Sequence, residues 1–338
     1  MKRLSLFVSA VLLAGSPALA QVSTHQGPVF TFLNPDPIHP NLPNFFDGDY
    51  FGTGIAVTSS GKVVISTPGV PDREAFNGFP EDARVGTVYI FDGIGNSSVS
   101  VQKKFPSLLD TFGVNLTTIG DQIFVTAPSE LIGQGASARA GALYAFSASG
   151  SPGILAAPVF TSPYLLSEYD NGSVPAVGNN FPLGLFLNGA RIAGNESVFV
   201  SDRKPNPDGG SAYVIHQLNG AGGLVRTLEA PDQIHHPFYD QFFDGITPLD
   251  NGQLFYPLAV SENRLLASFL SSRVRGIFEY DFDGNLTRTY LHPDAAQGVD
   301  FGSVSSIAFL GDDVLIGELG GDIFQFNDRT GDSIRTID

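Results

Sequence analysis

Two long loops of the chain repeat a pattern that combines histidine, carboxylate and aromatic side chains. Segment 29–48 matches segment 225–245 with one inserted residue, and both contain Phe-Phe-Asp-Gly at their end. The first loop carries His39, the second carries His235, and a shorter third copy carries His292. An imidazole beside a carboxylate can ligate a metal ion or act as an acid and a base. The repetition therefore makes these loops the leading candidate for a functional site.

Carboxylates and aromatic rings accompany the three histidines. Aromatic rings can line an apolar pocket or stack on a sugar ring. Carboxylates supply negative charge and hydrogen-bond acceptors. The candidate ligand-binding residues are His39, Phe46, Asp47, Asp49, His235, Phe243, Asp244 and His292. A structural interpretation stays open, in which proline stiffens each loop, histidine bonds to the backbone and the Phe-Phe pairs pack between sheets.

A weaker candidate for a metal site is a short acidic turn. Asp281, Asp283 and Asn285 place side-chain oxygens at alternating positions, as Ca²⁺ coordination requires. The same turn is typical of a β-hairpin, which is the competing interpretation. Elsewhere the chain has no nucleophile elbow, no His-Glu-x-x-His, no phosphate-binding loop and no dinucleotide fingerprint. The absence of cysteine excludes thiol catalysis and Cys-ligated zinc.

The elements that carry these loops repeat along the chain. Two β-rich runs joined by a polar turn, typical of a hairpin, recur at 55–66, 116–126, 192–201, 258–268 and 307–317. A third alternating run follows each hairpin, at 86–91, 141–146, 210–215, 276–280 and 322–326. Several copies add a fourth run, at 225–228, 287–290 and 333–337. Each unit therefore reads as four strands, which we label A to D in chain order.

This repeat predicts an all-β fold, a β-propeller of four-stranded antiparallel blades. A single sheet of this kind cannot cover both its faces, so radial stacking buries each face on a neighbour. Five blades are visible, and six or seven stay open because a divergent blade would fit within 150–190 or 233–257. Residues 27–32 look like one more D strand, and in one interpretation they close the ring against the last blade. A β-sandwich is the alternative fold.

The propeller fold predicts that the histidine loops lie together. Each loop follows a strand D and precedes a strand A, and the D–A connections of a propeller lie on one face around the central opening. The acidic segment 68–85, which we interpret as a B–C connection, belongs to the same face. We therefore expect the candidate residues to share one rim of the molecule.

The first twenty residues have the layout of a secretory signal peptide. Lys2 and Arg3 precede a mostly apolar stretch at 4–13, and 18–20 is a small-x-small cleavage site. We predict cleavage after Ala20, a single β-propeller domain over 21–338, and a secreted or periplasmic protein. No later stretch is apolar over the ~18 residues that a membrane span needs, so we expect no membrane anchor.

The chain is strongly acidic. It has 34 Asp and Glu against 18 Lys and Arg, a net charge of −16, and loss of Lys2 and Arg3 would lower this to −18. Nucleic acid and anionic lipid attract basic surfaces, so neither is expected as a partner. The carboxylates can hold a hard cation or keep the protein soluble.

The first two units resemble FG-GAP repeats, the blades of integrin-α-like propellers. Residues 49–148 carry the resemblance through Phe51-Gly52 and Phe112-Gly113, and Phe301-Gly302 opens the last unit in the same way. The resemblance implies Ca²⁺ bound by an acidic Asp-x-Asp-x-Asp-Gly turn between strands A and B. The corresponding turns, 58–61 and 119–121, lack that pattern. We therefore predict no cofactor, and Ca²⁺ would need another site.

These observations lead to three functional expectations. The first is a secreted, non-catalytic propeller that binds an extracellular glycan, a peptide or a protein surface through its D–A face. The second is a metal-assisted hydrolase or lactonase that uses the rim histidines and aspartates. The third is a structural component of an extracellular assembly. The oligomeric state stays open.

Overall fold

The computed structural model describes residues 51–68, 86–92, 98–103, 112–131, 139–149, 154–155, 157–163, 187–192, 195–205, 211–249, 253–261, 263–271, 273–327 and 329–337. Within these ranges the chain is β-strand and turn, with two short 3-10 helices. The predicted signal peptide, residues 27–32 and the first histidine loop lie outside them, so His39, Phe46, Asp47 and Asp49 have no structural account.

The described strands form five sheets of four or five strands, here named blades one to five. Blade one contains β1 (Gly54–Val57), β2 (Val63–Thr67), β3 (Thr87–Phe91) and β4 (Ser98–Lys103), with β8 (Ile154–Leu155) parallel to β4. Blade two contains β5 (Leu116–Ile119), β6 (Gln122–Leu131), β7 (Arg139–Ser147) and β9 (Phe160–Thr161). Blade three contains β10 (Leu187–Ile192), β11 (Asn195–Pro205), β12 (Ser211–Asn219) and β13 (Leu224–Leu228). Blade four contains β16 (Gln253–Val260), β17 (Arg264–Leu270), β18 (Arg275–Asp281) and β19 (Leu286–Tyr290). Blade five contains β20 (Val304–Leu310), β21 (Asp313–Glu318), β22 (Ile323–Phe326) and β23 (Ser333–Ile337).

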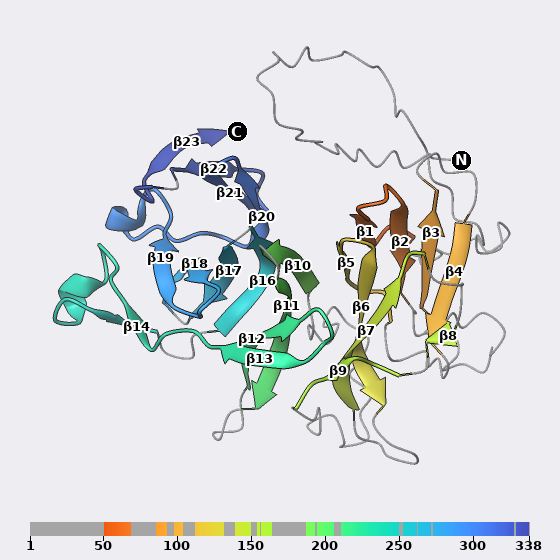
Figure 1. Cartoon of the computed structure of the whole chain (residues 1–338). Helices are drawn as coiled ribbons and strands as arrows, with labels where there is room; N and C mark the ends of the chain where they lie inside the picture. The colour runs from red at the N-terminus through yellow and green to blue at the C-terminus, as the bar shows by residue number, and fades with distance from the viewer. Residues whose placement is uncertain are drawn as a thin grey trace, which may run out of the picture.

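The blades are arranged side by side around their first strands. β1 lies against β5, β5 against β10, β10 against β16, and β16 against β20. In Figure 1 these inner strands follow an arc, with the later strands of each blade farther out. Antiparallel four-stranded sheets in this arrangement form an all-β propeller, which confirms the fold class that the repeat predicted.

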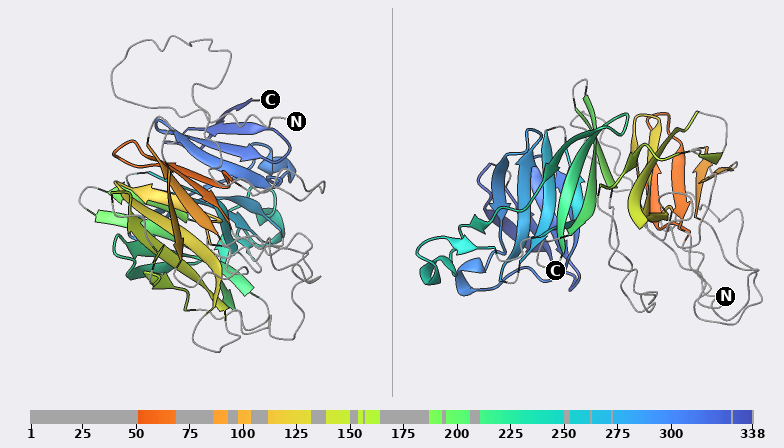
Figure 2. Two further views of the ribbon diagram at one scale, coloured as in Figure 1. Left: turned by 90° about the vertical axis from the view of Figure 1, so that its right-hand side faces the viewer. Right: turned by 90° about the horizontal axis from the view of Figure 1, so that it is seen from below.

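The connection between blades three and four has a structure of its own. β14 (Gln233–Ile234) and β15 (Thr247–Pro248) form a separate two-stranded ribbon that encloses the 3-10 helix η3 (Asp240–Phe242). This ribbon projects from the body of the molecule, as two views show (Figure 1 and Figure 2). Residues 233–248 therefore hold no further blade. Most of 150–190 lies outside the described ranges, so a sixth blade there stays a prediction.

The second 3-10 helix, η4 (Ala295–Gln297), lies in the connection between blades four and five. No helix in the described ranges is long and apolar enough to cross a membrane.

Apolar side chains on the outer two strands of one blade pack against the next blade. Ile277 of β18 and Tyr290 of β19 are paired across the sheet and fully buried. The Tyr290 ring meets Phe326 of blade five edge on, with 5.5 Å between ring centroids. Deleting an aromatic side chain from such a core costs about 3–5 kcal/mol. Equivalent buried pairs are Val88–Val101 in blade one and Ile215–Leu228 in blade three.

Arginines on the outermost strands add a second link between blades. Arg226 of β13 donates to the backbone carbonyl of Asp283, in the turn between β18 and β19. Arg288 of β19 donates in the same way to the carbonyl of Arg329, in the turn between β22 and β23, at 3.1 Å. Blade three is therefore joined to blade four, and blade four to blade five, at the outer edge as well as through apolar faces.

A buried carboxylate is satisfied within blade four. Glu279 is 5% exposed and accepts hydrogen bonds from the Tyr290 hydroxyl at 2.7 Å and the Thr287 hydroxyl at 3.1 Å. The guanidinium of Arg264 lies 3.9 Å away. Burial, together with the Glu279 carboxylate, raises the pKa of Tyr290 to about 12.

We predict that stability falls as the pH rises from 10 to about 12. The folded chain keeps the Tyr290 proton up to about pH 12, whereas the ordinary pKa is 10.0. The stabilisation is therefore complete below pH 10 and is lost as the pH rises through the folded pKa. The urea midpoint of Tyr290→Phe should fall less steeply with pH than that of the wild type. A residual slope is expected because burial also raises the pKa of Tyr280, but equal slopes in the two proteins would contradict the prediction.

Candidate functional site

The projecting ribbon is organised around one carboxylate. Asp240 Oδ1 accepts hydrogen bonds from the His236 backbone N–H at 3.0 Å and from the Thr247 hydroxyl at 2.8 Å. Burial opposes ionisation of Asp240, but these bonds and the neighbouring His235 hold its pKa below the ordinary value. The ribbon turns back through Asp244, whose φ of 53° lies in the left-handed region. Asp240 thus ties both arms of the ribbon to η3.

His235, a predicted site residue, lies on the surface of this ribbon. Its side chain is 80% exposed, and Nδ1 lies 3.0 Å from the Gly245 carbonyl oxygen and 3.3 Å from Asp240 Oδ2. Because Nδ1 faces two acceptors, it carries the proton, and Nε2 is the ring atom left to face solvent. His235 therefore helps to fold the loop and has one nitrogen for an external partner.

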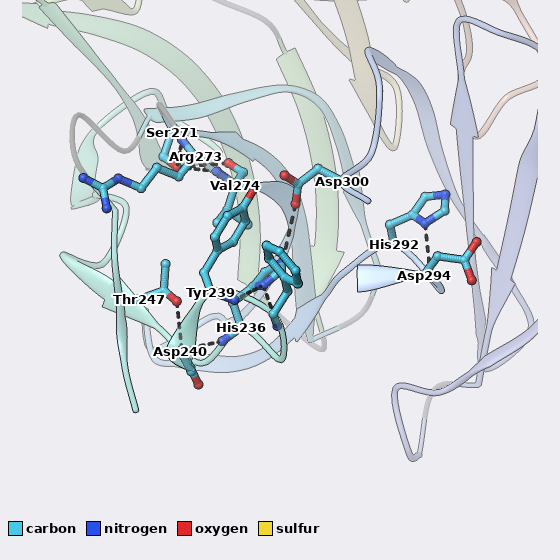
Figure 3. A network of polar contacts seen from close by, with 11 residues as sticks. His236, Tyr239, Asp240, Thr247, Ser271, Arg273, Val274, His292, Asp294 and Asp300 are labelled. Carbon is cyan, nitrogen blue, oxygen red and sulfur yellow. Dashed lines mark hydrogen bonds and ion pairs between the residues drawn. The ribbon is translucent and has the colours of Figure 1, made fainter. Parts of the chain in front are cut away.

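The adjacent His236 is the buried residue of the pair. Its ring is fully buried, and Nδ1 accepts from the backbone N–H groups of Phe238 and Tyr239, each at 3.3 Å. The proton therefore lies on Nε2, which is 3.4 Å from Asp300 Oδ1 (Figure 3). The two side chains are not oriented to form a hydrogen bond with each other, so His236 Nε2 and Asp300 Oδ1 are both buried without a full hydrogen-bond partner. His236 and Asp300 thus form a weak polar contact between two separate D–A connections.

Packing reinforces this contact. Gly298, which ends η4 with a φ of 80°, lies under the Phe238 ring, and a Cβ there would come within 3.1 Å of that ring. The His236 and Tyr239 rings lie 4.7 Å apart, and Phe238 meets Tyr239 edge on at 5.1 Å. The connections after blades three and four therefore pack against each other.

Aromatic and polar side chains cover the outside of the ribbon. Phe242 is 63% exposed and leans on Phe238, with ring centroids 5.6 Å apart. Phe243, a predicted site residue, is partly buried beneath the Arg273 guanidinium, 4.5 Å from the ring centroid. Gln241 and the predicted Asp244 are exposed beside them. We call Phe238, Tyr239, Gln241, Phe242 and Asp244 the aromatic rim.

His292, the third predicted histidine, does not join His235. Its Nδ1 accepts the Asp294 backbone N–H at 3.0 Å (Figure 3), and its ring packs edge on against Phe301 and Phe324 of blade five. The structural interpretation expected a histidine that bonds to the backbone; here the imidazole accepts that bond, and the ring also packs on aromatic side chains. His292 therefore anchors the connection between blades four and five to blade five itself.

The acidic turn at 281–285 is the hairpin between β18 and β19. Asp281 accepts from the Asn285 backbone N–H and from its side-chain amide, both at 2.8 Å. Burial opposes ionisation of Asp281, but these bonds keep its pKa below the ordinary value. The Asp283 carbonyl receives Arg226, and its side chain is exposed. The turn thus has the internal hydrogen bonds of a hairpin.

Among the residues that the structure describes, no three metal-ligating side chains lie close enough to share an ion. The predicted convergence of histidine and aspartate is therefore not seen for His235, Asp244 and His292. The other members, His39, Asp47 and Asp49, lie outside the described ranges, so the hypothesis of a larger cluster is untested.

Sequence reasoning missed His236 and Asp300. The second loop reads Ile-His-His-Pro where the first reads Ile-His-Pro, so the inserted residue is the signal that was available. Alignment to the single histidine of the first loop selected His235 and passed over its buried neighbour.

Comparison with known proteins finds only distant structural likenesses. No family model and no curated protein matches the chain. BamB from Moraxella catarrhalis is 16% identical over 85% of this chain and 64% of its own, with a TM-score of 0.42. The WD40 β-propeller domain of Doa1 is 12% identical over 85% and 69%, with a TM-score of 0.39. A chain of the Mitotic Checkpoint Complex is 11% identical over 92% and 75%, with a TM-score of 0.45. This chain spans less than two thirds of the BamB chain.

We predict that His236 holds the ribbon in place. His236→Ala removes the acceptor of two backbone N–H groups and leaves a cavity beneath Tyr239. Hydrogen exchange of residues 233–248 should accelerate at least tenfold, while the strands of blade four, which do not contain this ribbon, should change little. His235→Ala, at the exposed neighbouring position, is the matched control and should have a much smaller effect. Equal acceleration in the two variants would contradict the assignment.

We also predict that acid loosens the same ribbon. A carboxylate with a lowered folded pKa stabilises the fold above its ordinary pKa of 3.8, and this stabilisation is lost as the pH falls through the folded pKa. Pepsin should therefore cleave near Phe242 and Phe243 increasingly below pH 3.8. Asp240→Asn should already be cleaved there at pH 4.5. A peptide substrate corrects for the pH dependence of pepsin itself. If the corrected cleavage then depends on pH in the same way in both proteins, Asp240 is not the group whose protonation loosens the ribbon.

Proposed function

We propose that this chain is an exported binding protein that holds its partner on the aromatic rim. The observation that carries the proposal is an exposed Phe242 ring on a ribbon whose fold is fixed by internal hydrogen bonds. Apolar side chains that gather on one exposed surface mark interaction sites, and the exposed Phe242 ring lies against Phe238, which in turn contacts Tyr239. Preorganisation of the loop favours binding because little conformational entropy remains to be lost.

The proposal extends to the class of partner. An aromatic face beside amide and carboxylate groups is suited to a sugar ring, because the ring face stacks on CH groups while Gln241 and Asp244 accept hydroxyl protons. A glycan is therefore the preferred partner, with a peptide or protein surface as the alternative. The net charge of −16 makes nucleic acid and anionic lipid unfavourable.

Location and family remain part of this proposal. The signal-like residues 1–20 support export to the periplasm or the cell exterior. The resemblance to FG-GAP repeats is supported by the backbone at the Phe-Gly pairs, since Gly52 and Gly113 have φ values of 94° and 95° that favour glycine. Gly302 is not among the positive-φ glycines, so the last unit follows the motif in sequence only.

The hydrolase alternative has less support. Catalysis requires an acid, a base or a metal within contact of one point. His235 and His292 each hold a backbone group through Nδ1, and they lie in different packing environments. That alternative would have to rest on His39, Asp47 and Asp49.

A glycan microarray tests the proposed function. The wild-type chain should bind a restricted set of glycans, and Phe242→Ser should weaken that binding at least tenfold. The matched control is Leu319→Ser, which removes a 79% exposed apolar side chain from the turn between β21 and β22 and should leave binding unchanged. Equal binding by the two variants would refute the role of the aromatic rim. Binding to a peptide array alone would refute the choice of a glycan.

A further inference from the structure

The turn between β17 and β18 packs against the projecting ribbon. Val274 of this turn is fully buried, in the same core cluster as Ile234 of the ribbon and Leu249 beside it. The hydroxyl of Ser271 accepts hydrogen bonds from the backbone N–H groups of Arg273 and Val274, at 3.2 and 2.9 Å. Ser271 is itself buried. The turn therefore has a fixed conformation, and the ribbon rests on it.

This turn holds Arg273 on the ribbon. The guanidinium carbon lies 4.5 Å from the centroid of the Phe243 ring, so the cation stacks on the aromatic face. Figure 3 shows the Arg273 side chain extending away from the contact between His236 and Asp300. The N–H groups of a guanidinium lie in its plane, and stacking fixes that plane. The position of Arg273 is therefore set by the fold before a ligand arrives.

A second arginine lies next to the first. Arg275 begins β18 and is exposed, whereas Arg273 is half-buried. The buried Val274 separates the two in the chain. Arg275 forms no ion pair with any residue that the structure describes. Two positive charges are therefore placed within a few residues of each other beside the base of the ribbon.

These arginines differ from those on the outer strands. Arg226 and Arg288 each donate to a backbone carbonyl of the following blade, and Arg335 donates to Gln325 in its own blade. Those three guanidinium groups join strands or blades, whereas Arg273 covers an aromatic ring of the projecting ribbon. In a chain with 34 acidic and 18 basic residues, a pair of arginines is a local exception. Such a pair attracts an anionic group.

The neighbouring carboxylates limit the charge that a ligand can carry. Asp240 lies on the same ribbon, where Thr247 and the His236 backbone bind it, and Asp244 is exposed four residues later. Together with the net charge of −16, they repel a ligand with closely spaced negative charges. A ligand with one anionic group among hydroxyl and CH groups avoids most of that repulsion.

The ribbon brings such an anionic group within reach of an exposed ring. Phe242 and Phe243 are consecutive, so their Cα atoms lie about 3.8 Å apart. Phe242 leans on Phe238 and is 63% exposed, while Phe243 lies beneath Arg273. A sugar ring can stack on Phe242 while a carboxylate attached to a sugar takes two parallel N–H bonds from the guanidinium.

We propose that Arg273 and the aromatic rim together select an acidic glycan, one built with uronic acids. Arg273 binds the uronate carboxylate, and Arg275 adds attraction over a longer range. This inference rests on the proposed function, which requires a glycan of any charge. It adds that the charge of the glycan decides its affinity.

An array of oligouronates and their methyl esters tests this selection. The array carries oligomers of galacturonate, glucuronate, mannuronate and guluronate, each as the acid and as the fully methylated ester. The ester keeps the sugar rings and removes the charge. The wild-type chain should bind at least one acid form at least tenfold more tightly than its ester, because hydrogen bonds to charged groups are the stronger ones. Added salt should reduce this difference.

Arginine variants assign the selection to a residue. Arg273→Gln should weaken binding of the acid form at least tenfold and leave binding of the ester within twofold. Arg273→Lys keeps the charge without the planar guanidinium and should recover only part of the loss. The matched control is Arg329→Gln, which removes an exposed arginine from the turn between β22 and β23 and should change neither affinity. Equal urea midpoints show that the variants remain folded.

The outcomes separate this inference from the proposed function. Equal binding of acids and esters by the wild-type chain would overturn the inference and leave a glycan-binding function standing. Acid-selective binding that Arg273→Gln does not change would overturn the role of Arg273. Binding of no glycan in either form would overturn both proposals. The comparison of acid and ester uses the wild-type chain alone, so it decides the charge preference even if a variant is unstable.

Discussion

The burial of an outer-strand side-chain pair of one blade against the next blade is the interaction on which the rest of the structure depends. A four-stranded antiparallel sheet has two faces and cannot cover either alone, so each blade is stable only beside a neighbour. The seam between blades four and five shows this most clearly, because Tyr290 satisfies both requirements of a buried contact. Its ring fills the space beside Phe326, and its hydroxyl binds the buried Glu279.

The aromatic rim follows from that packing. The connections after blades three and four meet because their parent blades are pressed together, which brings Asp300 to His236 and Gly298 beneath Phe238. A ribbon with few strand hydrogen bonds of its own thereby acquires a fixed conformation. This explains how an exposed Phe242 can be presented in a defined position rather than on a flexible loop.

Much of the fold could be predicted from the sequence, because strand signals are local. The alternating runs at 258–268 and 276–280 became β16 to β18, and the outer runs at 225–228 and 287–290 became β13 and β19. The turn at 281–285 could be read both as a cation loop and as a hairpin, and its hydrogen bonds fit the hairpin. The number of blades depends on segments such as 150–190, where the local sequence pattern does not show whether the chain forms a further blade.

The site was harder to predict, because it depends on contacts between segments far apart in the chain. Repetition identified His235 and His292, yet the structure gives them unrelated neighbours. The residue that joins the two connections is His236, which the alignment treated as an insertion. Its burial and its partner Asp300 are properties of the folded chain, and the inserted histidine, the one signal in the sequence, reveals neither of them.

A double-mutant cycle across the seam between blades four and five tests the central claim most directly. Tyr290→Leu, Phe326→Leu and the double variant would be compared by urea unfolding. If the ring contact holds the blades together, the two substitutions should be coupled by about 0.5–1.5 kcal/mol. Changes in unfolding free energy that add within about 0.3 kcal/mol would show that the blades are not joined through these rings.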